Sequence, residues 1–184
     1  GVAVLHREEK RGLGRAYMDG FRKVLREMDA TFIVQMDADL SHRPERLPAM
    51  LDAVQEADLV LGSRCVAGGG TRNWGLHRRL VSRFGSLYAR FWLGLSIRDL
   101  TGGYKVWHRD LLGRVLQYPI HADGYAFQIE TTYLASRLGA RILEVPILFV
   151  DRNVGGSKMT ARIVLEAVWQ VPCMRWRYAR VEPL

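Results

Sequence analysis

The sequence lacks several features that would place it in a specialised class of protein. Its 184 residues include only two cysteines, Cys65 and Cys173, far apart and without metal-binding spacing. They make neither a disulfide framework nor a cysteine metal motif, so a reducing compartment is expected. No apolar run reaches the roughly 18 residues of a membrane-spanning helix. Nucleotide-binding P-loops, dinucleotide fingerprints and the Gly-x-Ser-x-Gly motif of hydrolases are also absent.

The sequence does carry an excess of positive charge, with a formal net charge of +8 and a pI of about 9.9. Its content of 48% hydrophobic and 25% charged residues is that of a globular domain able to bury a core. A basic balance favours an anionic partner, such as a nucleotide, a lipid phosphate, a membrane surface or a nucleic acid. The positions of the cations must decide between these partners.

Strand and helix patterns alternate over the first 62 residues. Short apolar runs at 2–5, 31–36 and 58–61 predict strands, and helical spacing predicts helices over 15–28 and from Pro44. This alternation predicts a parallel sheet with right-handed crossovers. The later part predicts helices over 76–93, 109–116, 126–138 and 159–174, and strands over 104–107, 141–145 and 147–150.

Two carboxylates, Asp37 and Asp39, directly follow the predicted strand over 31–36. Ligands of open α/β sheets bind at the C-terminal ends of the strands, and charged groups there are costly unless they meet opposite charge. Mg²⁺ binds well to one or two carboxylates together with phosphate oxygens. The pair therefore predicts a metal site that holds a diphosphate, with an ordinary turn after a strand as the alternative.

Three polar residues are expected near these acids. Arg64 follows the strand over 58–61, so it should lie at the same sheet edge. Arg78 and Ser82 are four residues apart on a helix, so they share a face that can hold a phosphate. For each cation, a solvated surface side chain is the alternative.

The segment 151–158 carries Arg152 and Lys158 with two glycines and a serine, a composition typical of loops that close over a phosphate. An ordinary connector is the alternative. Gln128 and Glu130 lie two residues apart near a helix start, where they need not act together.

The predicted helix over 76–93 interleaves arginines with aromatic and aliphatic residues. This pattern is typical of a helix that lies in the plane of a membrane interface. A helix that packs on the protein's own core and exposes a basic face to solvent is the alternative. Nucleic-acid binding is not expected, because the cations alternate with bulky apolar residues and no recognition motif is present.

Taken in order, these segments resemble the polyprenol-phosphate (dolichol-phosphate) mannosyltransferases of glycosyltransferase family 2. The resemblance runs from about residue 2 to residue 158, and each short motif alone is weak. The matching segments are 10–17, 36–42, 62–64, Arg78 with Ser82, 99–104, 124–130 and 145–158.

The resemblance implies an α/β fold of the GT-A type, with a Rossmann-like, mostly parallel sheet flanked by helices. It implies a catalytic domain over 1–158, followed by a C-terminal amphipathic helix and tail over 159–184. Family members begin with strands that end in a Pro-x-x-Asn-Glu-like motif and help to bind the base. Because this chain opens at Gly1 on what resembles a later strand, we expect its base pocket to be incomplete.

The resemblance also implies roles for residues. It implies Mg²⁺ or Mn²⁺ on Asp37 and Asp39, where Ser41 replaces the glutamine of some members. Catalytic roles would fall to Asp39 and Arg64, and supporting roles to Gln128 and Glu130. Donor binding would involve Gly14, Asp37, Ala38 and Asp39, and the acceptor phosphate would be held by Arg64, Arg78, Ser82, Arg152 and Lys158.

The reaction implied is inverting transfer of mannose from GDP-mannose to a polyprenyl monophosphate. An acceptor phosphate oxygen is already ionised at neutral pH, so positioning and charge stabilisation would replace a strong general base. The enzyme would lie peripherally at the cytoplasmic face of a membrane, with room for a membrane-anchoring partner protein. Another nucleotide-hexose such as UDP-glucose, and a non-catalytic membrane-binding fragment, are the alternatives.

Overall fold

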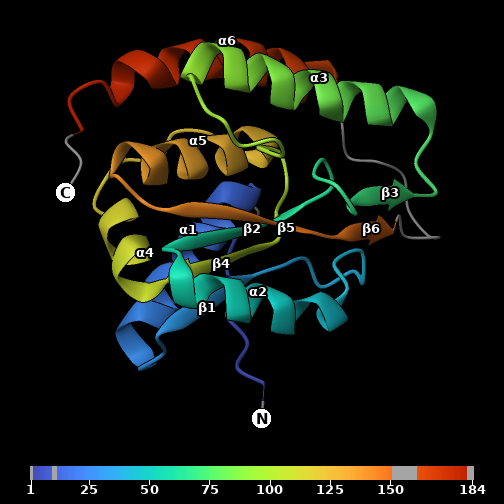
Figure 1. The fold of residues 1–184 in the computed structure, drawn as a ribbon. Helices are drawn as coiled ribbons and strands as arrows, with labels where there is room; N and C mark the ends of the chain where they lie inside the picture. Colours follow the sequence, from blue (N-terminus) through green and yellow to red (C-terminus); the bar gives the residue numbers. More distant parts are fainter. Residues whose placement is uncertain (1, 10–11, 151–160, 182–184) are drawn as a thin grey trace.

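The computed structural model describes residues 2–9, 12–150 and 161–181, and its centre is a four-stranded sheet (Figure 1). The strand order is β1-β4-β2-β5. The strands are β1 (Phe32–Gln35), β2 (Leu59–Ser63), β4 (Lys105–His108) and β5 (Ile142–Pro146).

Three of these strands run in the same direction. β2 pairs with β5 in parallel, whereas β4 is antiparallel to both β1 and β2. Gln35 of β1 and Leu61 of β2 both pair with Lys105, so β1 and β2 end at the same edge of the sheet. The predicted α/β fold with a sheet flanked by helices is confirmed. The sheet itself is mixed rather than mostly parallel, because β4 lies antiparallel between β1 and β2.

Helices cover both faces of the sheet (Figure 1). Helix α5 lies over one face with α3 and α6 in a layer outside it, and α2 lies against the other face. The predicted helix over 76–93 matches α3 at both ends, and Gly94 (φ 68°) closes it in the left-handed conformation. The helices are α1 (Leu13–Glu27), α2 (Leu47–Ala53), α3 (Leu76–Leu93), α4 (Arg109–Val115), α5 (Gly124–Arg137) and α6 (Ala161–Arg177), with 3₁₀ turns Pro44–Arg46 and Val54–Glu56 beside α2.

The alternation of side chains along the strands divides the core in two. Ile33 and Trp107 face the larger cluster, which joins the sheet to α1, α4, α5 and α6. Val60 and Val106 face a smaller cluster that contains Met50 of α2. The sheet is therefore buried on both faces, as its near-continuous apolar strands predict.

A second sheet of two parallel strands, β3 (Gly70–Arg72) and β6 (Leu148–Val150), extends from the end of the main one. β3 lies in a segment for which the sequence pattern predicts neither a helix nor a strand. Gly69 lets the chain fold back here, because a side chain at this position would meet the carbonyl oxygen of Ser63 at 2.5 Å. β6 carries Phe149, and the loop after β3 carries Trp74, to the candidate site described below.

The predicted strand over 2–5 is wrong. Residues 2–7 have no regular structure, and the side chain of Val2 is 92% exposed. A strand forms only where another strand pairs with it, and the described chain pairs none with this segment.

Helix α6 packs against α3 and α5, and its residues Val171 and Met174 are buried in the larger cluster, as is Tyr178 directly after the helix. The domain boundary at 158/159 falls outside the described residues and stays a prediction. No helix in the described part of the chain is long and apolar enough to span a bilayer.

Candidate active site

The turn after β1 holds the two predicted metal ligands. Both Oγ and the backbone N–H of Ser41 donate to Asp39 Oδ1, at 2.6 and 3.1 Å. Between them, Leu40 adopts a left-handed backbone with φ of 65°, a conformation that costs a non-glycine residue free energy. The hydrogen bonds of Ser41 to Asp39 hold this strained turn in place.

Asp37 is held from two sides. Tyr17 Oη donates to Asp37 Oδ1 at 3.0 Å, and the tyrosine ring stacks on Phe21 and Phe127. Burial, followed by the charge of Asp37, raises the pKa of Tyr17, so the hydroxyl stays a donor. On the other side, the backbone N–H of Asp37 donates to His42 Nδ1 at 2.9 Å. Burial lowers the pKa of His42, which favours the neutral ring that can accept this bond.

The two carboxylates suit a divalent cation that takes its remaining ligands from a diphosphate. Asp37 keeps 40% of its side chain exposed, and Asp39 is exposed. Within the described ranges, no cluster of three or more His, Cys, Asp or Glu side chains could enclose a metal by itself. Two acidic residues with phosphate oxygens match the coordination that Mg²⁺ prefers.

Arg64 is fixed beside β2 by a buried carboxylate. Its Nε and Nη2 donate to the two oxygens of Asp99 at 2.7 and 2.6 Å, and its backbone N–H donates to Asp99 at 2.9 Å. Burial alone would raise the pKa of Asp99, but the charge and hydrogen bonds of Arg64 outweigh burial and lower this pKa. Glu144 of β5 accepts hydrogen bonds from the backbone N–H groups of Arg98 and Asp99. The loop that carries Asp99 is therefore anchored to the sheet.

The other two predicted phosphate ligands on α3 lie next to Arg64. Arg64 Nη2 donates to Thr101 Oγ1 at 2.8 Å, and Ser82 Oγ lies 3.4 Å from the same oxygen. Arg64 and Arg78 both lie over the ring of Trp74, with Cζ 5.2 and 4.2 Å from its centroid. The structure thus brings Arg64, Arg78 and Ser82 together around Trp74 and Thr101.

Gln128 and Glu130 of α5 make hydrogen bonds to different parts of the chain and do not contact the same partner. Gln128 Oε1 accepts from Gln35 at the end of β1. Glu130 is fully buried and accepts hydrogen bonds from Arg177 and Tyr178 of the C-terminal segment. Both side chains therefore support the elements that carry the site.

The other residues predicted for the site differ in how far they are buried, and two of them lie outside the described residues. Gly14 is buried, and a side chain there would meet the Ala122 carbonyl oxygen at 2.8 Å, so α1 packs closely here. Ala38 is exposed beside the acids. Arg152 and Lys158 lie outside the described residues.

Sequence reasoning missed residues that hold the site from behind. Tyr17 and Asp99 lie inside the matching segments 10–17 and 99–104, so the resemblance pointed to them without indicating a role. Phe149 lies inside the matching segment 145–158 in the same way, whereas Trp74 lies in none of these segments. The importance of both rings comes from contacts with residues distant in the sequence.

Residues 1–116 match the model of the family "Glycosyl transferase family 2". The chain is 50% identical over 178 residues to an undecaprenyl-phosphate mannosyltransferase of Micrococcus luteus, which covers 97% of this chain and 72% of the relative. The chain belongs to glycosyltransferase family 2. It is also 44% identical over 171 residues to a polyprenol monophosphomannose synthase of Mycolicibacterium smegmatis, covering 92% of this chain and 64% of that relative. The predicted family and class of enzyme are confirmed.

The fold is confirmed by a solved glycosyltransferase of distant sequence. The glucosyl-3-phosphoglycerate synthase of Mycobacterium tuberculosis, solved with Mn²⁺, UDP-glucose and phosphoglyceric acid, superposes with a TM-score of 0.62 at 17% identity. The match covers 94% of this chain and 57% of that chain. The GT-A arrangement is therefore shared, whereas this likeness carries no conclusion about substrates.

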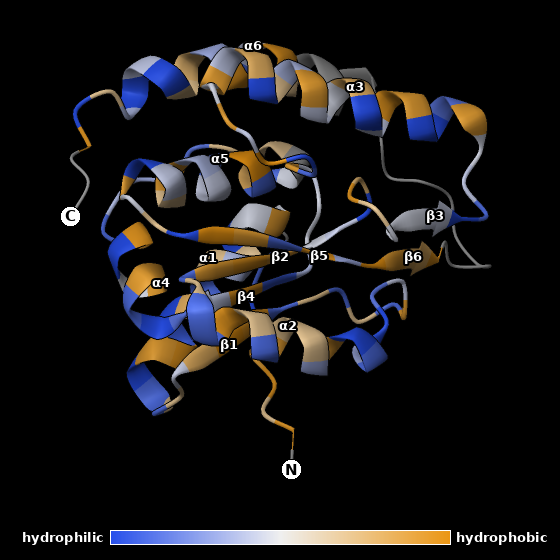
Figure 2. Ribbon diagram, viewed as in Figure 1, coloured by the Kyte–Doolittle hydropathy of each residue, from blue (hydrophilic) through white to orange (hydrophobic). Residues whose placement is uncertain are grey.

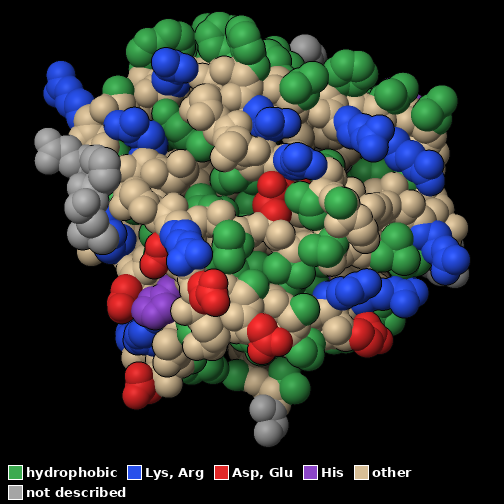
Figure 3. Space-filling model, in the orientation of Figure 1, with side chains coloured by type: hydrophobic (Ala, Val, Ile, Leu, Met, Phe, Trp, Pro, Cys, Tyr) green, Lys and Arg blue, Asp and Glu red, His purple; other side chains and the backbone are tan. Residues whose placement is uncertain are grey.

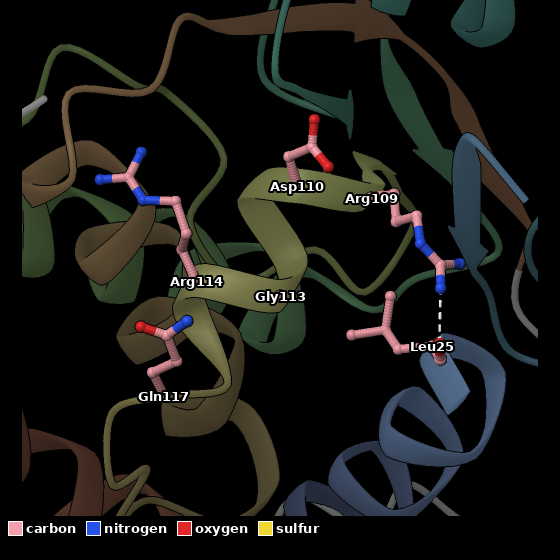
Figure 4. Close-up of a pocket in the computed structure, with 6 residues that line it drawn as sticks. All are labelled: Leu25, Arg109, Asp110, Gly113, Arg114 and Gln117. Carbon is pink, nitrogen blue, oxygen red and sulfur yellow. Dashed lines mark hydrogen bonds between the residues drawn. The ribbon is translucent and has the colours of Figure 1, made fainter.

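An open depression in the surface is lined by Leu25 of α1 and by residues of α4 and the turn after it (Figure 4). It lies at the opposite end of the sheet from the acids. β4 runs from Lys105, beside Gln35, to His108, beside Phe32, and Arg109 follows at the far end. Arg109 donates to the carbonyl oxygens of Leu25 and Met28, so it caps the end of α1. Arg109 therefore has a structural role at the end of α1, and the depression is not part of the candidate site.

Proposed function

We propose that this glycosyltransferase transfers mannose from GDP-mannose to a polyprenyl monophosphate, with inversion at the sugar carbon. The observation that carries the proposal is the meeting of two subsites at one edge of the sheet. One subsite is the carboxylate pair Asp37 and Asp39, and the other is the arginine pair Arg64 and Arg78. The names of two relatives, which are 50% and 44% identical, support the same reaction class.

The carboxylate pair is proposed as the donor subsite. Asp37 and Asp39 would hold Mg²⁺ or Mn²⁺, which when bound offsets the charge of a leaving nucleoside diphosphate. Tyr17 and Ser41 each direct one carboxylate oxygen, so the ligands are oriented in advance. Gly14 and Ala38 would lie next to the donor, where small residues let backbone and ligand approach.

The arginine pair, with Ser82, is proposed as the acceptor-phosphate subsite. Arg152 and Lys158 are proposed to join it from outside the described residues. The attacking phosphate oxygen is ionised at neutral pH, so its activation needs no strong base. Arg64 and Arg78 would align this oxygen with the sugar carbon, and a single displacement at that carbon inverts its configuration.

The outer faces of α3 and α6 are proposed as the surface that meets the membrane, where a polyprenyl phosphate presents its headgroup. Figure 3 shows hydrophobic side chains along this edge above a row of Lys and Arg. Large apolar residues with a basic flank suit an interfacial helix. The large apolar side chains exposed on these two helices are Leu76, Leu80, Phe84, Leu87 and Phe91 on α3, and Val168, Trp169 and Trp176 on α6. We further propose that the enzyme lies at the cytoplasmic face of this membrane and that a partner protein anchors it there.

Transfer assays on the full-length enzyme test the proposed function. With Mn²⁺ and polyprenyl phosphate, labelled GDP-mannose should give a labelled prenyl phosphate sugar. Asp39→Ala should lower this rate by more than about a hundredfold. Asp52→Ala, which removes an exposed carboxylate of α2, should leave the rate unchanged.

Two results would contradict the proposal in different ways. Transfer from UDP-glucose but not from GDP-mannose would favour another hexose donor with the same mechanism. Binding to vesicles without transfer from either donor would favour a non-catalytic membrane module.

A further inference from the structure

Trp74, in the loop between β3 and α3, contacts both arginines of the proposed acceptor subsite. The centroid of its ring is 5.2 Å from Cζ of Arg64 and 4.2 Å from Cζ of Arg78. Two guanidinium groups repel each other, and their charges are hard to bring together away from water. An indole ring attracts a guanidinium more strongly than the rings of the other aromatic side chains do. Trp74 therefore favours an arrangement that the two charges alone oppose.

Packing alone does not explain a tryptophan at this position. Trp74 is 7% exposed, and its buried Nε1 has no hydrogen-bond partner among the described residues. A buried donor without a partner destabilises a fold, and a phenylalanine would fill similar space without one. The feature that favours tryptophan here is its ring face, which two cations share.

Trp74 is also the end of a chain of ring contacts that reaches the acids. Its ring meets Phe149 of β6 edge to face at 5.3 Å, and Phe149 meets His42 in the same way at 5.4 Å. His42 in turn accepts the backbone N–H of Asp37. The metal-ligand turn and the arginine pair are thus connected by three packed rings, which resist changes in their separation.

We propose that Trp74 is a positioning residue that holds Arg64 and Arg78 as one anion-binding surface, at a set separation from the carboxylate pair. The inference rests on the proposed role of these arginines in binding a prenyl phosphate. Asp99 holds the edge of the Arg64 guanidinium, whereas Trp74 restrains its face and that of Arg78. Both arginines are then arranged before the phosphate arrives.

Binding of a soluble short-chain prenyl monophosphate to the full-length protein tests this role without requiring turnover. In calorimetry, Trp74→Leu should raise the Kd of this probe about tenfold, because both cation–π contacts are lost. Trp74→Phe, which keeps a ring face, should stay within about threefold of wild type. Trp92→Leu is the matched control, because it makes the same change on α3 away from both arginines.

A double-mutant cycle separates positioning from general support. If Trp74 acts through Arg78, Trp74→Leu should weaken binding less in an Arg78→Ala background than in wild type. Affinity of GDP-mannose with Mn²⁺ should change less than about twofold in Trp74→Leu.

Equal effects of Trp74→Leu in both backgrounds, or an equal loss of donor and acceptor affinity, would overturn the inference. So would wild-type affinity in Trp74→Leu. A wild-type protein that binds the prenyl phosphate but does not transfer mannose would contradict the proposed function alone. One that does not bind it would overturn both.

Discussion

At the residue scale, each of the two acids of the site accepts a hydrogen bond from an uncharged hydroxyl group. Ser41 is two residues from Asp39, so its role follows from the local turn. Tyr17 is 20 residues from Asp37, and only the packing of α1 against α5 brings its hydroxyl into reach. The acids themselves could be predicted from the sequence, whereas Tyr17 could not be assigned a role.

Tyr17→Phe should weaken metal binding without changing the fold. Loss of one hydrogen bond to Asp37 corresponds to about 0.5–1.5 kcal/mol, so Mn²⁺ affinity in the presence of GDP should fall by a factor of about 2 to 13. Titration of free Mn²⁺ by electron paramagnetic resonance measures this directly. Tyr88→Phe removes a hydroxyl that donates to the Val168 carbonyl oxygen, and it should leave the affinity unchanged. Equal Mn²⁺ affinity in Tyr17→Phe and wild type would show that the hydroxyl does not orient Asp37.

At the element scale, α3 combines two functions on different faces. One face carries Arg78 and Ser82 toward the site, and another exposes a stripe that includes Phe84 (64% exposed) and Phe91 (78% exposed). Apolar and polar residues alternate along the helix (Figure 2). Its range could be predicted because helical periodicity and Gly94 are local signals. The choice between an interfacial and a packed helix could not be made from the sequence, because it depends on which face the core covers.

Substitution of the exposed stripe should weaken membrane binding specifically. Phe84→Ser with Phe91→Ser removes two large apolar groups, each able to contribute roughly 1.5–3 kcal/mol when fully buried. Partial burial in the interface makes a loss of at least about tenfold in vesicle affinity the expected result. Sedimentation with vesicles of phosphatidylglycerol and phosphatidylcholine measures it. Met28→Ser, an exposed apolar residue at the end of α1, is the control. Unchanged sedimentation of the double variant would exclude α3 as the docking surface.

The order of the strands shows the limit of element-level prediction. β1 and β2 are consecutive along the apolar pattern, but β4 inserts between them. Its register joins Lys105 to both Gln35 and Leu61, pairings that link residues far apart in the chain. Strand neighbours depend on which apolar faces can be buried together, so a local pattern does not contain them.

At the scale of the whole molecule, Lys105 places an amine in the centre of the fold. Its Nζ donates to the Gln128 carbonyl oxygen and to the hydroxyls of Thr131 and Thr132, at 2.9 to 3.1 Å. Burial lowers the pKa of Lys105 to about 7. In the unfolded chain this pKa is about 10.4. Between these values the unfolded state binds more protons than the folded one, so this group makes the free energy of unfolding rise with pH.

Lys105→Met should therefore remove a pH dependence. From pH 7 to pH 9, the wild-type free energy of unfolding should gain up to about 1.4 kcal/mol per pH unit relative to the variant. Urea unfolding at pH 7, 8 and 9 measures the difference. Lys23→Met, which removes a partly exposed lysine paired with Glu27, should not change the slope. A Lys105→Met slope equal to that of wild type would contradict the role of this amine.

The sequence by itself determined the class of fold, the acids after β1, the arginine after β2 and the extent of α3. These features follow from local periodicity, from turn and cap residues, and from the rule that sites form at strand ends. The tertiary structure decided that β4 lies between β1 and β2, that Tyr17 holds Asp37, and that Trp74 joins Arg64 to Arg78. Those features depend on burial and contact between residues far apart in the chain, which arise only when the whole core packs at once.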